Sequence, residues 1–245
     1  MSIEQLEQNW ESLGQSDPLW AILYDPARKD NQWTPEEFFA TGEEVIDDLM
    51  KHIDTLDVTF KRGRALDFGC GAGRLTQPLT KYFLHVDGVD ISTSMVDLAR
   101  SHNKAGPRCT YFLNTESDLS LFDDDSYDFV FTEIVLQHMP PDLMLGYVAE
   151  FMRILRPGGV ACFDIPPGYA KTLRGTLTRL APSPLLRLYR ERKHHDSVME
   201  LHYIKPTKVI DFLTAMGVRV VESRGLPDPE YAVTARHQYL VQRVR

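Results

Sequence analysis

The sequence predicts one doubly wound α/β domain built around a seven-stranded, mostly parallel sheet. From residue 64 onward, short apolar runs alternate with helical patterns, and parallel neighbouring strands need such helices to cross over from one to the next. The composition agrees, because 43% hydrophobic and 25% charged side chains over 245 residues are the proportions of an ordinary globular domain. We therefore expect ligands at the carboxyl ends of the strands, where such sheets bind them.

The apolar runs predicted as strands are Arg64–Phe68, Leu84–Asp90, Cys109–Leu113, Tyr127–Glu133, Gly159–Ile165, Val218–Ser223 and His237–Gln242. The helical patterns between them are Arg74–Tyr82, Thr93–His102, Pro141–Leu155 and Thr207–Met216. Because Gly225–Pro229 is typical of a turn and leaves no room for a helix, we expect the last two strands to pair antiparallel.

Residues 1–62 are predicted as an N-terminal helical cap of the same domain. In the stretch WTPEEFF, Thr34 can cap a helix, Pro35 suits its first position and Glu37 completes a capping box. The aromatic residues of this segment either cover the open edge of the ligand crevice or cover core; they are Trp10, Trp20, Tyr24, Trp33, Phe38 and Phe39. Residues 63–245 then form the main part of the domain, with a lid insertion at 166–204.

Several classes of function are excluded by composition. A net charge of −8 at pH 7 excludes a non-specific nucleic-acid binder, which needs a basic surface. Cys70, Cys109 and Cys162 form no CxxC pair and no Cys/His pair at zinc-ligand spacing, so we expect neither a disulfide scaffold nor a metal site. No run approaches the ~18 apolar residues that span a bilayer, and the first residues lack a secretory signal. We therefore expect a soluble, cytoplasmic protein.

The most informative stretch is RALDFGCGAGRL, where a strand ends in Gly69, Gly71 and Gly73 and turns into a helix. Glycines let the main chain approach a ligand closely, and the start of a helix offers unpaired N–H groups. Asp90 ends the next strand, where its carboxylate can accept hydrogen bonds from two ribose hydroxyls. A glycine loop followed by an acid at a strand end is typical of a nucleoside-cofactor site.

The spacing of the glycines separates two families. A dinucleotide-binding fingerprint is G-x-G-x-x-G/A, whereas here the pattern is G-x-G-x-G and Arg74 holds the sixth position. The ordered block ALDFGCGAGR, GVDIS, SYDFVFTEIVLQHMP and LRPGG resembles the class I S-adenosylmethionine-dependent methyltransferases with a Rossmann-like fold, over about residues 60 to 165. A nicotinamide-dependent oxidoreductase and a non-catalytic binding protein of the same fold are the alternatives.

The resemblance implies S-adenosylmethionine as cofactor and assigns residues to its parts. The loop that holds the methionine part consists of Asp67, Gly69, Gly71, Gly73 and Arg74. Asp90 corresponds to the acid that binds the ribose, and Ile91 and Met95 flank the adenine, although Met95 also fits ordinary helix core. Asp118 and Leu119 correspond to the contacts with the adenine amine and its face, with Glu116 as the alternative acid.

His138 is the candidate catalytic residue. Methyl transfer from a sulfonium mainly needs the reacting atoms aligned and water excluded, and a base only where the nucleophile arrives protonated. His138 follows the fourth predicted strand, at the edge where the cofactor is expected; a base and a packing histidine both fit this position. The position after that strand reads TEIVLQ, without the Pro-Pro-aromatic motif of nucleic-acid amine methyltransferases, so we expect a small-molecule acceptor, on a hydroxyl or an amine, as in natural-product methylation.

The lid insertion is rich in positive charge. Residues 171–195 hold seven basic side chains and one acid, interleaved with leucines, which is the pattern of an amphipathic segment. Such a lid suits an amphipathic or anionic acceptor and transient contact with a membrane surface; a solvated helix face is the alternative. The sequence leaves the acceptor and the oligomeric state open.

Overall fold

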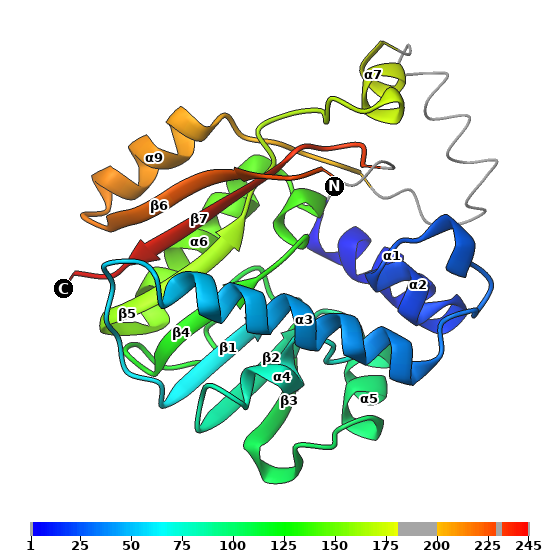
Figure 1. Cartoon of the computed structure of the whole chain (residues 1–245), viewed down its shortest axis with the longest axis horizontal. Coiled ribbons are helices and arrows are strands. Elements are labelled where there is room, and N and C mark those ends of the chain that lie inside the picture. Colours follow the sequence, from blue (N-terminus) through cyan, green and yellow to red (C-terminus); the bar gives the residue numbers. More distant parts are fainter. Residues whose placement is uncertain (1, 181–199, 229–231, 245) are drawn as a thin grey trace.

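A computed structural model describes residues 2–180, 200–228 and 232–244. Its seven-stranded sheet has the order β3-β2-β1-β4-β5-β7-β6 and confirms the predicted fold class (Figure 1). The strands are β1 (Arg64–Phe68), β2 (His85–Asp90), β3 (Cys109–Leu113), β4 (Tyr127–Thr132), β5 (Leu155–Asp164), β6 (Arg219–Leu226) and β7 (Arg236–Gln242). The first five pair in parallel, and β7 lies antiparallel to both β5 and β6; the antiparallel pairing of the last two strands was predicted.

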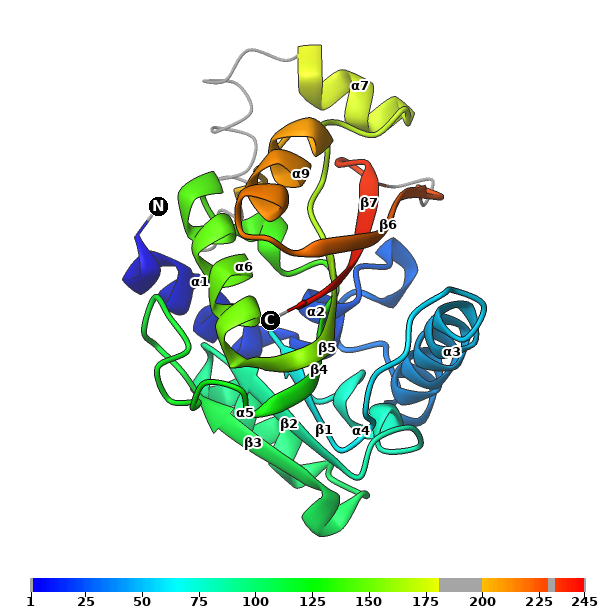
Figure 2. The same cartoon turned by 90° about the vertical axis from the view of Figure 1, so that its left-hand side faces the viewer.

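Helices cover both faces of the sheet. One face packs on α6 (Pro141–Ile154) and α9 (Pro206–Ala215). The other packs on α3 (Pro35–Ile53), α4 (Thr76–Leu79) and α5 (Thr93–Ser101). Figure 2 shows α6 and α3 on opposite sides of the strands. Fully buried aromatic side chains such as Tyr127, Phe129 and Phe131 of β4 make this central strand apolar on both faces, as a sheet covered on both sides demands.

The N-terminal segment is helical, as predicted. Its elements are α1 (Ile3–Ser16), α2 (Pro18–Ile22), the 3₁₀ turn η1 (Pro26–Arg28) and α3. Ser2 and Gln5 form a capping box at the start of α1. Thr34 caps α3 by accepting a hydrogen bond from the N–H of Glu37, with Pro35 at the first position. Leu6 of α1 joins the core under α6, and Ile46 of α3 joins the core on the other face.

Three elements differ from their predicted bounds by three residues or more. One is β6, which runs to Leu226 and so includes Gly225, predicted as part of a turn. The helix expected at Arg74–Tyr82 is only α4; Pro78 lies within it and has no N–H to donate to the carbonyl oxygen of Arg74, which a helix starting at Arg74 would need. β5 begins at Leu155, four residues before the predicted Gly159, and an irregularity in its pairing with β4 lies between Tyr127 and Phe129.

The insertion after β5 is described only in part. Its described part contains α7 (Leu173–Leu180), which lies beyond the sheet (Figure 1). Most of the basic residues predicted to face an acceptor, including Arg187, Arg190 and Arg192, lie outside the described residues. The remaining turns are η2 (Gly106–Arg108) and η3 (Leu136–His138). Within the described ranges no helix is long and apolar enough to cross a membrane, and no His, Cys, Asp and Glu cluster could hold a metal ion.

Candidate active site

The glycine loop after β1 is held against the ends of two neighbouring strands. The N–H groups of Gly69 and Cys70 both donate to the carbonyl oxygen of Val89 in β2, at 2.8 and 3.0 Å. Gly69 has a φ of +72°, and a Cβ there would lie 2.5 Å from the Val135 side chain. Any other residue would be strained by this φ and would clash with Val135, so the position requires glycine. Gly73, also predicted for the cofactor, packs over the hydroxyl of Tyr111 and does not line the cavity described next.

A cavity opens at the carboxyl ends of β1, β2 and β4. The space inside it, open solvent at its mouth included, is about 950 Å³. The predicted residues that line it are Asp67, Gly69, Gly71, Arg74, Asp90, Ile91 and Met95. The N-terminal cap closes it, because Ile3, Leu6 and Trp10 of α1 and Ile22 of α2 also line it. Of the six aromatic residues of the cap, only Trp10 lines the cavity. Phe38 is buried in the core instead.

The cap is tied to the first turn of α5. The Glu11 carboxylate in α1 accepts hydrogen bonds from the Ser94 N–H at 3.0 Å and from the Ser92 hydroxyl at 2.8 Å. A Cβ on Gly14 would lie 2.2 Å from the Ser94 hydroxyl, so α1 approaches α5 closely there. No local sequence pattern marks Glu11 as a partner of residues more than eighty positions away.

Two strand-end acids face the cavity with different surroundings. Asp67 is almost fully buried, accepts a hydrogen bond from the Thr76 hydroxyl at 2.6 Å, and burial raises its pKa to about 7. Asp90 accepts the Gly71 N–H at 2.8 Å and the Ser92 N–H at 2.9 Å. The Asp90 carboxylate therefore shapes the glycine loop as well as presenting charge to the cavity.

Arg74 takes part in a buried chain of charges. Its guanidinium lies 3.5 Å from one oxygen of Glu133, and Arg236 of β7 binds the other oxygen. The hydroxyl of Thr41 in α3 lies 3.4 Å from Arg74. Glu133 and Arg74 line the cavity. The sequence gives no sign of Arg236, because only the antiparallel placement of β7 brings its first residue to this edge of the sheet.

The chain turns sharply where β4 ends. Ile134 has a φ of +62°, a left-handed conformation that a β-branched residue rarely adopts and that stores strain of order 1–3 kcal/mol. Its N–H donates to the Asp164 carboxylate at 2.7 Å; burial raises the pKa of Asp164 to about 6. The turn places Ile134 and Val135 in the cavity wall beside the glycine loop.

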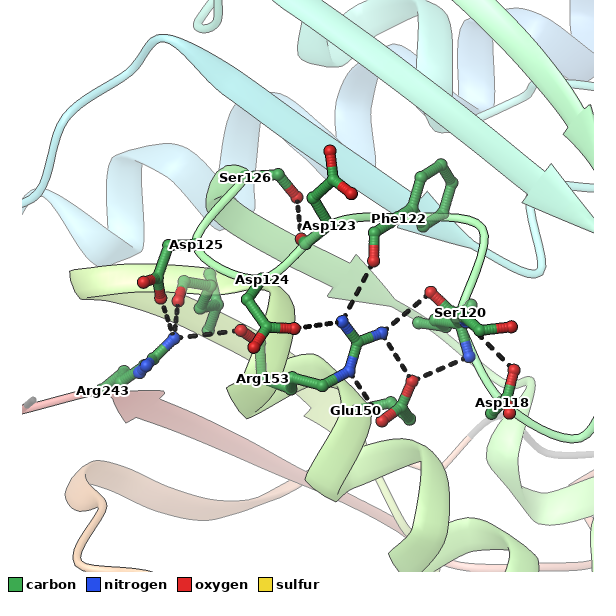
Figure 3. A network of polar contacts seen from close by, with 12 residues as sticks. Asp118, Ser120, Phe122, Asp123, Asp124, Asp125, Ser126, Glu150, Arg153 and Arg243 are labelled. Carbon is green, nitrogen blue, oxygen red and sulfur yellow. Dashed lines mark hydrogen bonds and ion pairs between the residues drawn. The ribbon is translucent and has the colours of Figure 1, made fainter.

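Two predicted residues, Asp118 and Leu119, do not reach the cavity. The acidic loop that contains them is tied to α6 by Arg153, which donates to the carbonyl oxygens of Leu119 and Phe122 and to the Glu150 carboxylate (Figure 3). Glu150 in turn accepts the Leu119 N–H at 2.9 Å. The other acid weighed for this position, Glu116, is exposed and does not line the cavity either.

Asn114 at the end of β3 lies in the wall instead, and its side-chain amide donates to the Asp118 carbonyl oxygen at 2.7 Å. No feature of the sequence distinguished this asparagine from the other polar residues of the loop.

His138 lies beside the cavity without lining it. Its ring packs edge-on against Trp10, with the ring centroids 5.3 Å apart, and Trp10 does line the cavity. Burial lowers the pKa of His138 to about 4. Hydrogen bonds to the backbone of Glu200 and Ile134 act in the opposite direction and raise this pKa. The imidazole is therefore neutral at pH 7. The packing role and the role of a proton acceptor both remain compatible with this position.

Comparison with known proteins decides the family. Residues 65–159 match the model of a family described as a methyltransferase domain. The chain carries a class I S-adenosylmethionine-dependent methyltransferase domain. The match covers all four motifs of the sequence block, and it decides against the nicotinamide-dependent oxidoreductase and the non-catalytic binding protein.

Relatives of this methyltransferase agree. A ubiquinone biosynthesis O-methyltransferase of Coxiella burnetii is 24% identical over 178 residues, 72% of each chain; one from Burkholderia vietnamiensis is 25% identical over 66% of this chain and 67% of its own. The magnesium protoporphyrin IX methyltransferase of Synechocystis, solved with S-adenosylhomocysteine, superposes with a TM-score of 0.65 at 19% identity over 98% and 99% of the two chains. A Leishmania major S-adenosylmethionine-dependent methyltransferase gives 0.65 at 16% identity, over 98% and 82%.

S-adenosylmethionine is the cofactor of the methyltransferase, and the cavity fits it. Its wall contains three carboxyl side chains, Asp67, Asp90 and Glu133, and one guanidinium, Arg74. Such an acidic wall suits the positive sulfonium and ammonium groups of this molecule. Ile22 of the cap packs closely on the glycine loop, since a Cβ on Gly71 would lie 2.7 Å from the Ile22 side chain.

Proposed function

We propose that this methyltransferase transfers the methyl group to a hydroxyl oxygen of a small molecule such as a sugar, a lipid or a natural-product intermediate. The observation that carries the proposal is a neutral imidazole, His138, at the carboxyl edge of the sheet. A hydroxyl arrives protonated and needs a proton acceptor. The names of the O-methyltransferase relatives support oxygen as the acceptor atom. An amine acceptor is the alternative.

The cofactor residues are proposed from the wall of the cavity. When bound, S-adenosylmethionine supplies a methyl carbon already activated by its sulfonium. In our assignment Gly69 and Gly71 leave room for the methionine part, with Asp67 and Arg74 beside them. Asp90 accepts from the ribose hydroxyls. The adenine lies between Ile91, Met95 and Asn114, which replaces Asp118 and Leu119 in this role.

A weakly basic imidazole is sufficient for the proposed reaction. The hydroxyl becomes far more acidic as its oxygen forms the bond to the methyl carbon, so the proton is transferred late and readily. A base with a pKa of about 4 takes the proton at that stage and stays unprotonated beforehand. His138 can thus accept the proton of the acceptor hydroxyl, because it is not already protonated at neutral pH.

The acceptor is proposed to enter between the cavity and His138. Trp10 stands between them, because its ring lines the cavity and packs on the histidine. An acceptor hydroxyl reaches both groups only if Trp10 moves, and Trp10 moves with α1. We therefore propose residues 1–62 as a cap of the same domain, which excludes water while it is closed over the site.

The insertion 166–204 is proposed as the lid on the acceptor side. In its described part, Leu173 and Leu177 are one helical turn apart in α7 and are 79% and 60% exposed, so they present an apolar edge to solvent. Together with the basic residues of the sequence, this edge suits an amphipathic or anionic acceptor, or the lipid surface that carries one.

The test combines methyl-labelled S-adenosylmethionine with a panel of phenols, sugars, hydroxylated lipids and amines, and mass spectrometry locates the label. We expect the label on oxygen; label on nitrogen or carbon would contradict the proposal. With the acceptor in hand, His138→Ala should lower kcat and leave the affinity for S-adenosylhomocysteine unchanged. His102→Ala is the matched control. His102 lies at the end of α5, where its ring contacts Phe39 of α3, and it does not line the cavity. Normal turnover of His138→Ala would assign this histidine to packing.

A further inference from the structure

The turn after β4 is bound by a carboxylate that lies outside the cavity. Asp164 ends β5, is 5% exposed and does not line the cavity. Its side chain accepts the N–H of Ile134 at 2.7 Å. Burial raises the pKa of Asp164 to about 6, so the carboxylate is charged at neutral pH. This hydrogen bond is therefore of the strong, charge-assisted kind.

The hydrogen bond falls on a strained residue. Ile134 has a φ of +62°, and a branched side chain adopts this left-handed conformation only where the surrounding contacts impose it. β4 and β5 are parallel neighbours, with Thr132 opposite Phe163, so Asp164 comes to the end of β4 at the point where the chain turns. The energy of its hydrogen bond offsets the strain of this turn.

The direction of the turn sets the cavity wall beside the glycine loop. Ile134 and Val135 both line the cavity, and the Val135 side chain lies 2.5 Å from the position of a Cβ on Gly69. The next residue, Leu136, is fully buried in the core that α6 covers. If Ile134 relaxed to a negative φ, the chain would leave β4 in another direction, and Val135 would lose its place on the glycine loop.

We propose that Asp164 is a positioning residue of the cofactor cavity, which holds Ile134 in the left-handed conformation and so keeps Val135 against the glycine loop. The inference rests on the proposed cofactor site, in which Gly69 leaves room for the methionine part of S-adenosylmethionine. Because Asp164 does not line the cavity, it acts through the backbone of Ile134. The role needs a hydrogen-bond acceptor at position 164 and a left-handed backbone at position 134, and variants remove each of them separately.

The affinity for S-adenosylhomocysteine, measured by titration calorimetry at neutral pH, tests the acceptor. Asp164→Ala removes it, and we expect the affinity to fall by about fivefold or more as Ile134 relaxes. Asp164→Asn keeps an oxygen that accepts the same N–H, so its affinity should stay close to the native value. A loss smaller than about fivefold in Asp164→Ala, or larger than that in Asp164→Asn, would overturn the proposal.

Asp128→Ala is the matched control for a weakened fold. Asp128 is buried, accepts the backbone N–H groups of Gly63 and Arg64, and does not line the cavity. This variant should unfold at a lower urea concentration and keep native affinity in its folded fraction. A loss of affinity equal to that of Asp164→Ala would assign both effects to stability and refute the positioning role.

Two substitutions of Ile134 test the backbone conformation. In the Asp164→Ala background, Ile134→Gly adopts the left-handed conformation without strain, whereas Ile134→Ala loses nearly the same side chain and keeps the strain. We expect the glycine variant to bind S-adenosylhomocysteine about fivefold more tightly than the alanine variant, or better. Equal affinities of the two variants would show that Asp164 does not act through this conformation.

The single substitutions of Ile134 keep the test decisive if Asp164→Ala does not fold. With Asp164 intact, Ile134→Gly should unfold at a higher urea concentration than Ile134→Ala, which reverses the order expected where φ is negative. The ordinary order would refute the strain and, with it, the proposal. This result does not depend on the cofactor. Native affinity of Asp90→Ala would reject the cofactor site and leave the order of the two stabilities in place.

Discussion

Asp90 offers the sharpest test of the cofactor site, because its carboxylate is bound to the glycine loop and is the group we assign to the ribose. It accepts the N–H groups of Gly71 and Ser92, and we assign it the ribose hydroxyls. Hydrogen bonds to a charged group contribute about 1.5–3 kcal/mol each, and about 1.4 kcal/mol is a factor of ten in affinity. Asp90→Ala should therefore weaken binding of S-adenosylhomocysteine by more than tenfold, as measured by titration calorimetry.

The control must separate lost contacts from a weakened fold. Asp87 lies on the same strand, is fully buried, and binds Arg64 and Tyr127 away from the cavity. Asp87→Ala should lower the free energy of unfolding in urea and leave the affinity of the folded fraction unchanged. If Asp90→Ala kept native affinity, or if Asp87→Ala lost as much affinity as Asp90→Ala, the assignment of the ribose to Asp90 would be refuted.

Three further predictions concern the cap, the buried acid and the packing of α3. Glu11→Gln removes the charge that binds the Ser92 hydroxyl, so α1 should open more often. S-adenosylhomocysteine should then dissociate several-fold faster, as measured by stopped-flow tryptophan fluorescence. An unchanged dissociation rate would show that α1 does not limit release.

Because the pKa of Asp67 is raised to about 7 by burial, its contribution to stability is fully present below about pH 4 and is lost as the pH rises through 7. Asp67→Asn should flatten this part of the pH dependence of urea unfolding, and an unchanged slope would contradict the shift.

Gly42→Ala should destabilise the protein by about 2 kcal/mol or more, since the new Cβ would lie 2.1 Å from a backbone oxygen. The control is Gly146→Ala in α6, where a new Cβ meets nothing within 4 Å. This variant should stabilise the protein by about 0.5–1 kcal/mol. Equal changes in the free energy of unfolding of the two variants would contradict the tight packing at Gly42.

The sequence predicted what depends on neighbours in the chain. The bounds of β1 and β3 agree with the apolar runs, and the cap of α3 forms at Thr34 as the local pattern requires. The predicted residues of the glycine loop and of the strand end at Asp90 lie together because both follow adjacent parallel strands. These features follow from the spacing of apolar residues and from the residue types at turns, both of which can be read from a single sequence.

The contacts it could not predict are those made across the sheet. Arg236 reaches Glu133 only because β7 runs antiparallel to β5, which brings position 236 to the edge where β4 ends. Asp118 was expected at the adenine from motif order alone, but the loop length after β3 lets Arg153 draw the following residues onto α6. Loop paths of this kind depend on partners that are distant in sequence.

One helix, α1, joins three parts of the site. It lines the cavity with Leu6 and Trp10, it is tied to α5 through Glu11, and Trp10 covers the ring of His138. A displacement of α1 that lets an acceptor reach His138 therefore also breaks the bonds of Glu11 and opens the cofactor cavity. Those bonds are partly buried and add to the apolar contacts that close the cavity. Under the proposed role of the cap, access of the acceptor and exchange of the cofactor depend on the same motion, and a variant that loosens α1 should change both.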